Sequence, residues 1–272
     1  MKAAPRARLA AFAAPTLLAG ALLASPASAQ QAPPAPGERI VTIGLGAQVY
    51  PRHPGADSLG IYPMPVFGLR RAGEPLPIEA ADDSWGFGLL GRDAPVNIGP
   101  AVRLLDRRKA EHVGAPVDEV GRTVEVGAFA ETYLTPAFRL RAEGRKGLGG
   151  HDGWMGDLAA DLLARGGETW VFSVGPRLRI ADRNYMNAYY GVTAAEAART
   201  GLPAYRAGGG IHAVGAMTGL RYQLSPAVGV HGYAGYDRLV GDAAQSPVVR
   251  AFGSRDQFSA GLGLSYSFAI GR

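Results

Sequence analysis

The residues of this sequence that are best placed to do chemistry are charged side chains that recur at every second position. In a β-strand, alternate side chains point to the same face of the sheet. Charges spaced in this way on neighbouring strands predict a cross-strand network of ion pairs. The alternative is a charged constriction that selects small anionic or zwitterionic solutes. The residues concerned are Arg139, Arg141, Glu143, Arg145, Asp157, Asp161, Arg177 and Arg179.

Other motifs that suggest chemistry lack the partners that the chemistry requires. His151-Asp152 lies among three glycines, which favours a tight turn over a metal site or a catalytic pair. No histidine is followed two residues later by a serine, and the chain has no cysteine. A Ser-His-Asp or thiol mechanism therefore has no visible set of residues. We expect a protein that is not an enzyme, with no catalytic residues, no metal and no cofactor.

The segments around the charges alternate in the same way, with apolar residues on the opposite face. In the last segment, an apolar face that ends in aromatic residues opposes a face of glycine and serine. This pattern is typical of a transmembrane β-barrel strand, and the charges of the other segments all fall on the polar face. A periplasmic β-sandwich, whose strands have the same period, is the alternative. The apolar residues of the last segment are Phe258, Ala260, Leu262, Leu264, Tyr266 and Phe268.

The alternating segments predict an all-β protein, an antiparallel transmembrane β-barrel of twelve strands, with ten as the alternative. The two weak segments are 75–80 and 85–90. Short connections alternate with longer ones, as short periplasmic turns alternate with outer loops. In the loop 182–209, a capping box at 193–196 and a following Gly201 predict a short helix over 194–200. We expect the tyrosines of this extracellular loop to hold it in place; they are Tyr185, Tyr189, Tyr190 and Tyr205.

The N-terminal sequence indicates export. Three basic residues precede an apolar stretch and an A-x-A site, which predicts a signal peptide at 1–29 that is cleaved near Ala29. We expect a Pro/Ala-rich periplasmic lead-in at 30–38, the barrel at 39–268 and a short C-terminal extension at 269–272. The whole chain carries a net charge of +5, and removing the three basic residues of the signal leaves +2. Nucleic acid is therefore not an expected partner.

Several motifs lie in the loops or at the strand ends beside them, at 44–56, 150–153, 181–192, 201–205, 239–249 and 253–258. In these stretches the chain resembles the MipA/OmpV family, the MltA-interacting outer-membrane proteins. The resemblance implies a place in the outer membrane of a Gram-negative cell, in contact with outer-membrane lipid. It also implies a scaffold that joins a lytic transglycosylase to a penicillin-binding protein and so organises peptidoglycan remodelling. The residues alone leave open the alternative of a passive, porin-like channel for small solutes.

Overall fold

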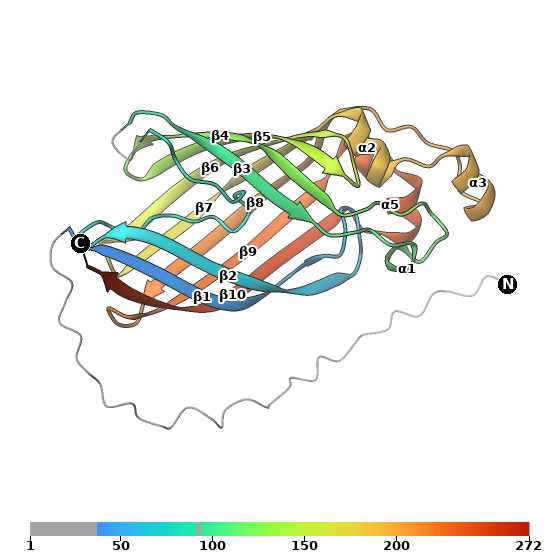
Figure 1. Ribbon diagram of the computed structural model, residues 1–272. Helices are drawn as coiled ribbons and strands as arrows, with labels where there is room; N and C mark the ends of the chain where they lie inside the picture. The colour runs from blue at the N-terminus through green and yellow to red at the C-terminus, as the bar shows by residue number, and fades with distance from the viewer. Residues whose placement is uncertain (1–36, 91–93, 272) are drawn as a thin grey trace, which may run out of the picture. The chain divides into compact units, whose positions relative to one another are not determined.

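The computed structural model describes residues 37–90 and 94–271. The expected signal peptide, positions 30–36 of the lead-in and Arg272 lie outside the described residues. The described chain forms a single antiparallel sheet of ten strands (Figure 1). The strands are β1 Arg39–Pro51, β2 Leu59–Arg71, β3 Asn97–Leu105, β4 Thr123–Thr135, β5 Phe138–Gly149, β6 Trp154–Gly166, β7 Trp170–Ala181, β8 Gly210–Gln223, β9 Val228–Leu239 and β10 Asp256–Ile270.

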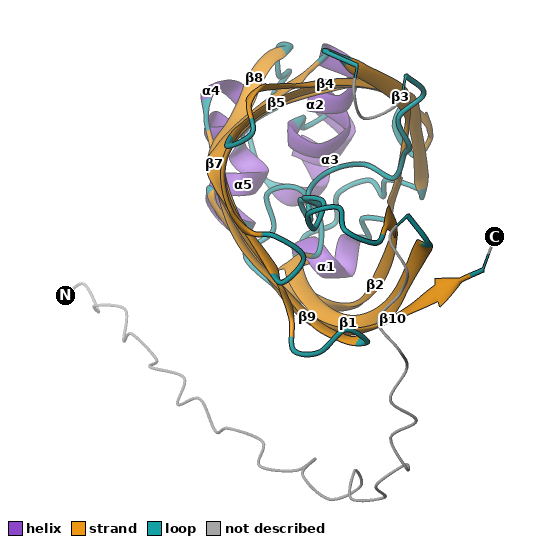
Figure 2. Ribbon diagram, turned by 90° about the vertical axis from the view of Figure 1, so that its left-hand side faces the viewer, coloured by secondary structure: helices purple, strands orange, loops and turns teal. Residues whose placement is uncertain are grey.

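The sheet curls so that its inner face surrounds other parts of the chain (Figure 2). The first strand returns to the last, because β1 pairs with β10 from Arg39 opposite Ile270 to Val49 opposite Ala260. The order of strands begins with β2 and ends with β3, so these are the two edges of the sheet. The fold is therefore a half-barrel of ten strands. Ten strands are the alternative expected from the sequence, and the first expectation, of twelve strands, is wrong.

The two weak segments account for the difference in strand number. Residues 75–80 form no strand and run inside the curled sheet, where Leu76 is 1% exposed. Their two prolines lack the N–H group that a strand within the wall must donate. Residues 85–90 lie along the free edge of β3, where Trp85 exchanges backbone hydrogen bonds of 2.9 and 2.8 Å with Val102. This pairing is an isolated bridge and not a full strand.

The edge strand β2 is regular although it contains two prolines. Its pairing with β1 runs without a shift from Arg71 opposite Arg39 to Leu59 opposite Pro51. Proline is tolerated at an edge because one side of an edge strand has no ladder that needs its N–H group. The prolines of β2 therefore fit the position of this strand at the end of the sheet.

Residues alternate between the two faces of the sheet as the sequence predicts. In β10, the side chains of Leu262 and Leu264 are 65% and 59% exposed, whereas Ser265 and Ser267 are 5% and 3% exposed. The outer face of the edge strand β2 is likewise apolar, with Ile61 79% exposed. The strand β10 continues to Ile270, two residues beyond the expected end of the barrel at residue 268.

At one end of the strands three connections, 106–122, 182–209 and 240–255, are long and carry helices, whereas those at 52–58 and 150–153 are shorter and carry none (Figure 1). We call this the helical end; at the opposite, short-turn end three tight turns join strands at 136–137, 167–169 and 224–227, and the long stretch 72–96 joins β2 to β3. Helix α3 has the expected capping box and ends at Gly201 in a left-handed conformation. None of the helices in the described ranges is both long and apolar enough to span a membrane. The helices are α1 Ala110–Val113, α2 Arg183–Tyr190, α3 Ala194–Thr200, α4 Gly241–Gln245 and α5 Pro247–Phe252.

The exposed apolar face gives a first testable prediction, which concerns two outward positions of β10. If this face meets lipid, Leu264→Arg near the middle of the strand places a charge at mid-bilayer depth and destabilises the folded protein by about 2–4 kcal/mol. The matched change Ile270→Arg at the end of the strand costs about 0–1 kcal/mol, because the charge reaches the interface. Heat-modifiable gel migration after refolding into vesicles measures the folded fraction. Equal tolerance of the two changes contradicts a lipid-facing exterior.

Candidate functional site in the charged interior

The eight charged residues singled out in the sequence lie together on the inner face of β5, β6 and β7. Seven of them have between 0% and 9% of their surface exposed. The exception is Arg179, whose side chain is 14% exposed. The ion pairs among the eight form two sets, which Glu131, Asp82 and Asp83 join into one network, so the structure brings the eight together on one surface.

Arg145 on β5 is the most enclosed cation of this network, with no exposed surface. Its guanidinium contacts Glu125 at 2.9 Å and both Glu143 and Asp157 at 2.5 Å. Glu125 also forms a hydrogen bond of 3.2 Å with Nε2 of His151, and this bond connects the 150–153 loop to the network. Removing one partner of such a buried pair leaves a charge without compensation and costs about 3–5 kcal/mol.

The two aspartates of β6 connect the strands on either side of them. Asp161 contacts Arg139 of β5 at 3.0 Å and Arg177 of β7 at 2.9 Å. Asp157 contacts Arg179 of β7 at 3.2 Å. The described residues contain no group of three or more histidines and carboxylates arranged to hold a metal ion. The carboxylates of the network instead accept hydrogen bonds from arginines across neighbouring strands.

A stretch of chain at 74–84, which we call the inner segment, enters the curled sheet from the short-turn end. Its first part is held by backbone groups. Leu76 donates its N–H to the carbonyl of Gly167 at 3.1 Å and accepts a hydrogen bond of 2.7 Å from Arg165. Further along, Glu79 forms an ion pair of 2.7 Å with Arg221 of β8. The inner segment is thus fixed to three parts of the wall before it reaches the charged network.

Asp82 of the inner segment contacts the arginine pair of β7. One of its carboxylate oxygens lies 2.7 Å from Arg177 and 3.3 Å from Arg179. Arg103 of β3 donates a hydrogen bond to the backbone carbonyl of the same aspartate. The inner segment is therefore bound to opposite parts of the curled sheet at a single residue.

Asp83 makes the equivalent contact with the arginine pair of β5. It lies 2.5 Å from Arg139 and 3.5 Å from Arg141. The next residue, Ser84, donates its hydroxyl to Glu143 at 2.6 Å. Each of the two adjacent aspartates thus bridges a pair of arginines that are two residues apart on one strand. Asp82 bridges the pair on β7, and Asp83 bridges the pair on β5. The inner segment closes the network across the interior.

Sequence reasoning missed the two aspartates, because the predicted strand boundaries placed them in a loop at 81–84. One signal was available: the predicted set contains five arginines but only three carboxylates. Buried arginines need acidic partners, so the imbalance indicated that further carboxylates must reach this face. Sequence spacing alone does not say that some of them come from inside the barrel.

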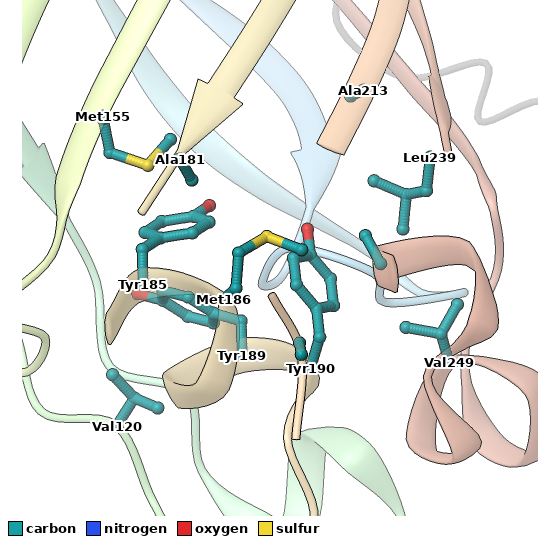
Figure 3. Packing of buried hydrophobic residues seen from close by; sticks show 12 residues of the cluster. Val120, Met155, Ala181, Tyr185, Met186, Tyr189, Tyr190, Ala213, Leu239 and Val249 are labelled. Carbon is teal, nitrogen blue, oxygen red and sulfur yellow. The ribbon is translucent and has the colours of Figure 1, made fainter. Parts of the chain in front are cut away.

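The tyrosines of the predicted outer loop lie mainly on α2, which the sequence did not predict. Tyr185, Tyr189 and Tyr190 are 4%, 2% and 0% exposed and pack among apolar residues such as Leu239 (Figure 3). Burial raises the pKa of Tyr189 to about 12. These rings therefore stay neutral at physiological pH and form the core of the helical end.

The contacts of α2 explain why this loop folds over the charged network. Asp182 caps the helix by accepting a hydrogen bond of 3.0 Å from the N–H of Tyr185. The ring of Tyr185 meets the His151 ring edge-on at 5.0 Å, so the tyrosine core lies directly against the network. A side chain at Gly153 would collide with the backbone N–H of Tyr185, only 2.4 Å from the position of its Cβ. Tyr205 is partly buried, packs against this core and donates its hydroxyl to the carbonyl of Asp242 at 3.0 Å.

Solved structures of outer-membrane proteins align with most of the chain at low sequence identity. OprG from Pseudomonas aeruginosa is 9% identical over 86% of this chain and 98% of its own, with a TM-score of 0.29. An outer-membrane channel from Pseudomonas putida F1 is 12% identical over 89% and 98%, with a TM-score of 0.40. The toluene transporter TodX of P. putida is 11% identical over 88% and 91%, with a TM-score of 0.31. Similarities at this level carry no argument about function. No curated protein matches the chain.

A family model gives a stronger result. The model of the MipA family, described as MltA-interacting protein MipA, matches residues 43–268. The match begins within β1 and ends within β10, so it includes the inner segment and the loops with the recognised motifs. It confirms the resemblance seen in those loops. The chain therefore belongs to the MipA family.

Proposed function

We propose that this protein is an outer-membrane β-barrel with a closed interior that anchors peptidoglycan-remodelling enzymes and catalyses no reaction itself. The observation that carries the proposal is the inner segment, which bridges the interior through Asp82 and Asp83. A wall that is apolar outside and sealed by ion pairs inside suits an anchor better than a pore.

The exterior and the loops support a place in the outer membrane. Apolar side chains cover the outer face of strands far apart in the sequence, including Leu45 of β1 and Leu162 of β6 at 65% and 60% exposed. Large exposed apolar surfaces mark sites of contact with lipid or protein. Apart from the connection 72–96, the turns at one end are short, and the helix-bearing loops all lie at the other, which matches the periplasmic and outer ends of such barrels. The short-turn end is then periplasmic, and the helical end faces the cell exterior.

The family description supports the choice of partner. Members are described as MltA-interacting proteins, and the resemblance in the loops implies a lytic transglycosylase and a penicillin-binding protein as partners. Enzymes that act on peptidoglycan work in the periplasm, so their docking surface belongs to the short-turn end. The turns at 136–137, 167–169 and 224–227 are among the parts of the wall that reach this side.

Affinity capture tests the anchor and its docking face together. We predict that the detergent-solubilised protein captures a murein hydrolase or a penicillin-binding protein from an envelope extract. Inserting a Gly-Ser linker after Pro226, in the short-turn connection 224–227, should reduce capture about tenfold because it displaces the docking surface.

The matched control is the same insertion after Gly201, which ends α3 at the helical end. This variant should capture the enzymes as well as the unchanged protein does. Heat-modifiable gel migration confirms that both variants are folded. If neither enzyme is recovered at low salt, or if both insertions reduce capture equally, the anchor with a short-turn docking face is rejected.

Conductance across a planar bilayer tests the closed interior. We predict that the unchanged protein gives no steady current, whereas the double change Asp82→Asn and Asp83→Asn produces frequent openings. The amides keep the size of the side chains but remove the charges that pair with four arginines. The inner segment is then held less tightly, because charge-assisted hydrogen bonds are about twice as strong as neutral ones.

The control for this experiment is Asp57→Asn with Asp152→Asn, which changes the net charge by the same amount at two exposed positions. It should leave the bilayer silent. A steady current from the unchanged protein would show that the interior conducts, and it would favour the alternative of a passive channel for small solutes.

A further inference from the structure

A shallow pocket at the helical end lies outside the charged interior and outside the proposed docking face. It occupies about 370 Å³ beside α5 and the ends of β9 and β10. Three arginines and a single aspartate supply its charges. The lining residues are Arg238, Val249, Arg250, Gly253, Ser254, Arg255 and Asp256.

Two of the three arginines are available to a ligand. Asp256 is paired with Arg238 at 2.5 Å. Arg250 and Arg255 form no ion pair with any other described residue, although both line the pocket. The backbone of Arg255 is fixed, because its carbonyl accepts a hydrogen bond of 2.8 Å from the N–H of Leu239. The pocket thus presents two guanidinium groups that form no ion pair, and one of them, Arg255, lies on a positioned backbone and is attracted electrostatically by Asp256.

The helix dipole of α5 explains why an arginine occurs at position 250 without any ligand, but it does not explain Arg255. Arg250 lies in the last turn of α5, where a cation is favoured by the helix dipole. Arg255 follows the helix and belongs to the loop before β10, so no dipole accounts for it. A planar guanidinium matches the oxygens of a phosphate group, and two of them suit a dianionic phosphate monoester.

A second pocket adjoins the first and has a mixed lining, in which apolar side chains lie beside the carboxylates of Asp57 and Asp256. It occupies about 400 Å³ and shares Ser254 and Asp256 with the arginine pocket. Leu59 and Phe258 line it, and their side chains are 46% and 56% exposed. Ile61, on the same face of β2 as Leu59, continues this surface along the apolar exterior. A cationic pocket thus opens beside one of mixed lining, whose apolar side, at Leu59 and Phe258, continues into the apolar outer face of the sheet.

We propose that this pair of pockets binds the phosphate monoester of a membrane lipid, with the phosphate at Arg250 and Arg255 and an acyl chain towards Leu59 and Phe258. Anionic headgroups lie at the depth where the apolar wall ends, and basic side chains at that level attract them. The site requires insertion in a membrane but does not require the anchor role. Capture of cell-wall enzymes can therefore fail while lipid binding stands.

Native mass spectrometry of the full protein, released from phosphatidylcholine bilayers with about 10% phosphatidic acid, tests the site. Phosphatidic acid carries a phosphate monoester, and phosphatidylglycerol, with a diester, replaces it in a parallel arm. We expect the unchanged protein to retain phosphatidic acid in preference to phosphatidylglycerol. The double change Arg250→Gln and Arg255→Gln should reduce that retention about tenfold.

The matched control is Arg183→Gln with Arg206→Gln, which removes two exposed arginines of the same end outside the pocket. It should retain the lipid normally. Arg250→Gln alone, a change at an exposed position, gives the same comparison if the double variant folds poorly. Equal losses in the pocket and control variants, or no preference for phosphatidic acid, overturn the proposal. If millimolar inorganic phosphate displaces the lipid, the site binds free phosphate, and the proposal of a lipid ligand is overturned.

Discussion

The contact on which this structure depends is the engagement of two adjacent aspartates with two pairs of arginines. Asp82 and Asp83 each bridge arginines on one strand, and the two strands lie on either side of β6. Buried guanidinium groups are tolerated only when carboxylates and hydrogen bonds surround them. The inner segment provides part of that surrounding, so the wall and the chain inside it stabilise each other.

The position of the inner segment also explains the incomplete wall. Residues that could have completed the sheet between β2 and β3 are drawn inside, and this leaves two edges. The edges are protected in different ways. The edge strand β2 carries prolines, which have no N–H group to leave unpaired. The edge of β3 is partly covered by residues 85–90, through the backbone bonds of Trp85 and of Leu89, whose N–H donates to Ile98 at 2.8 Å.

The helical end and the network form one continuous interior. His151 joins them, because it contacts Glu125 of the network and packs against Tyr185 of the tyrosine core. The apolar core therefore excludes water from one side of the ion pairs, which strengthens them by lowering the local dielectric. The functions proposed for this protein accordingly lie outside this interior, on the short turns and on the surface pockets.

The sequence by itself determined which residues face inwards, because the period of a strand is fixed at two and a membrane wall separates charge from apolar surface strictly. The eight network residues and the outward face of β10 follow from this rule. It also determined α3, whose capping box is local. Only the tertiary structure decided that the inner segment, 74–84, lies inside the curled sheet and that α2 buries its tyrosines. Both outcomes depend on contacts with residues far away in the sequence, namely the arginines of β5 and β7 and the apolar side chains of the helical end. No local sequence pattern predicts these contacts.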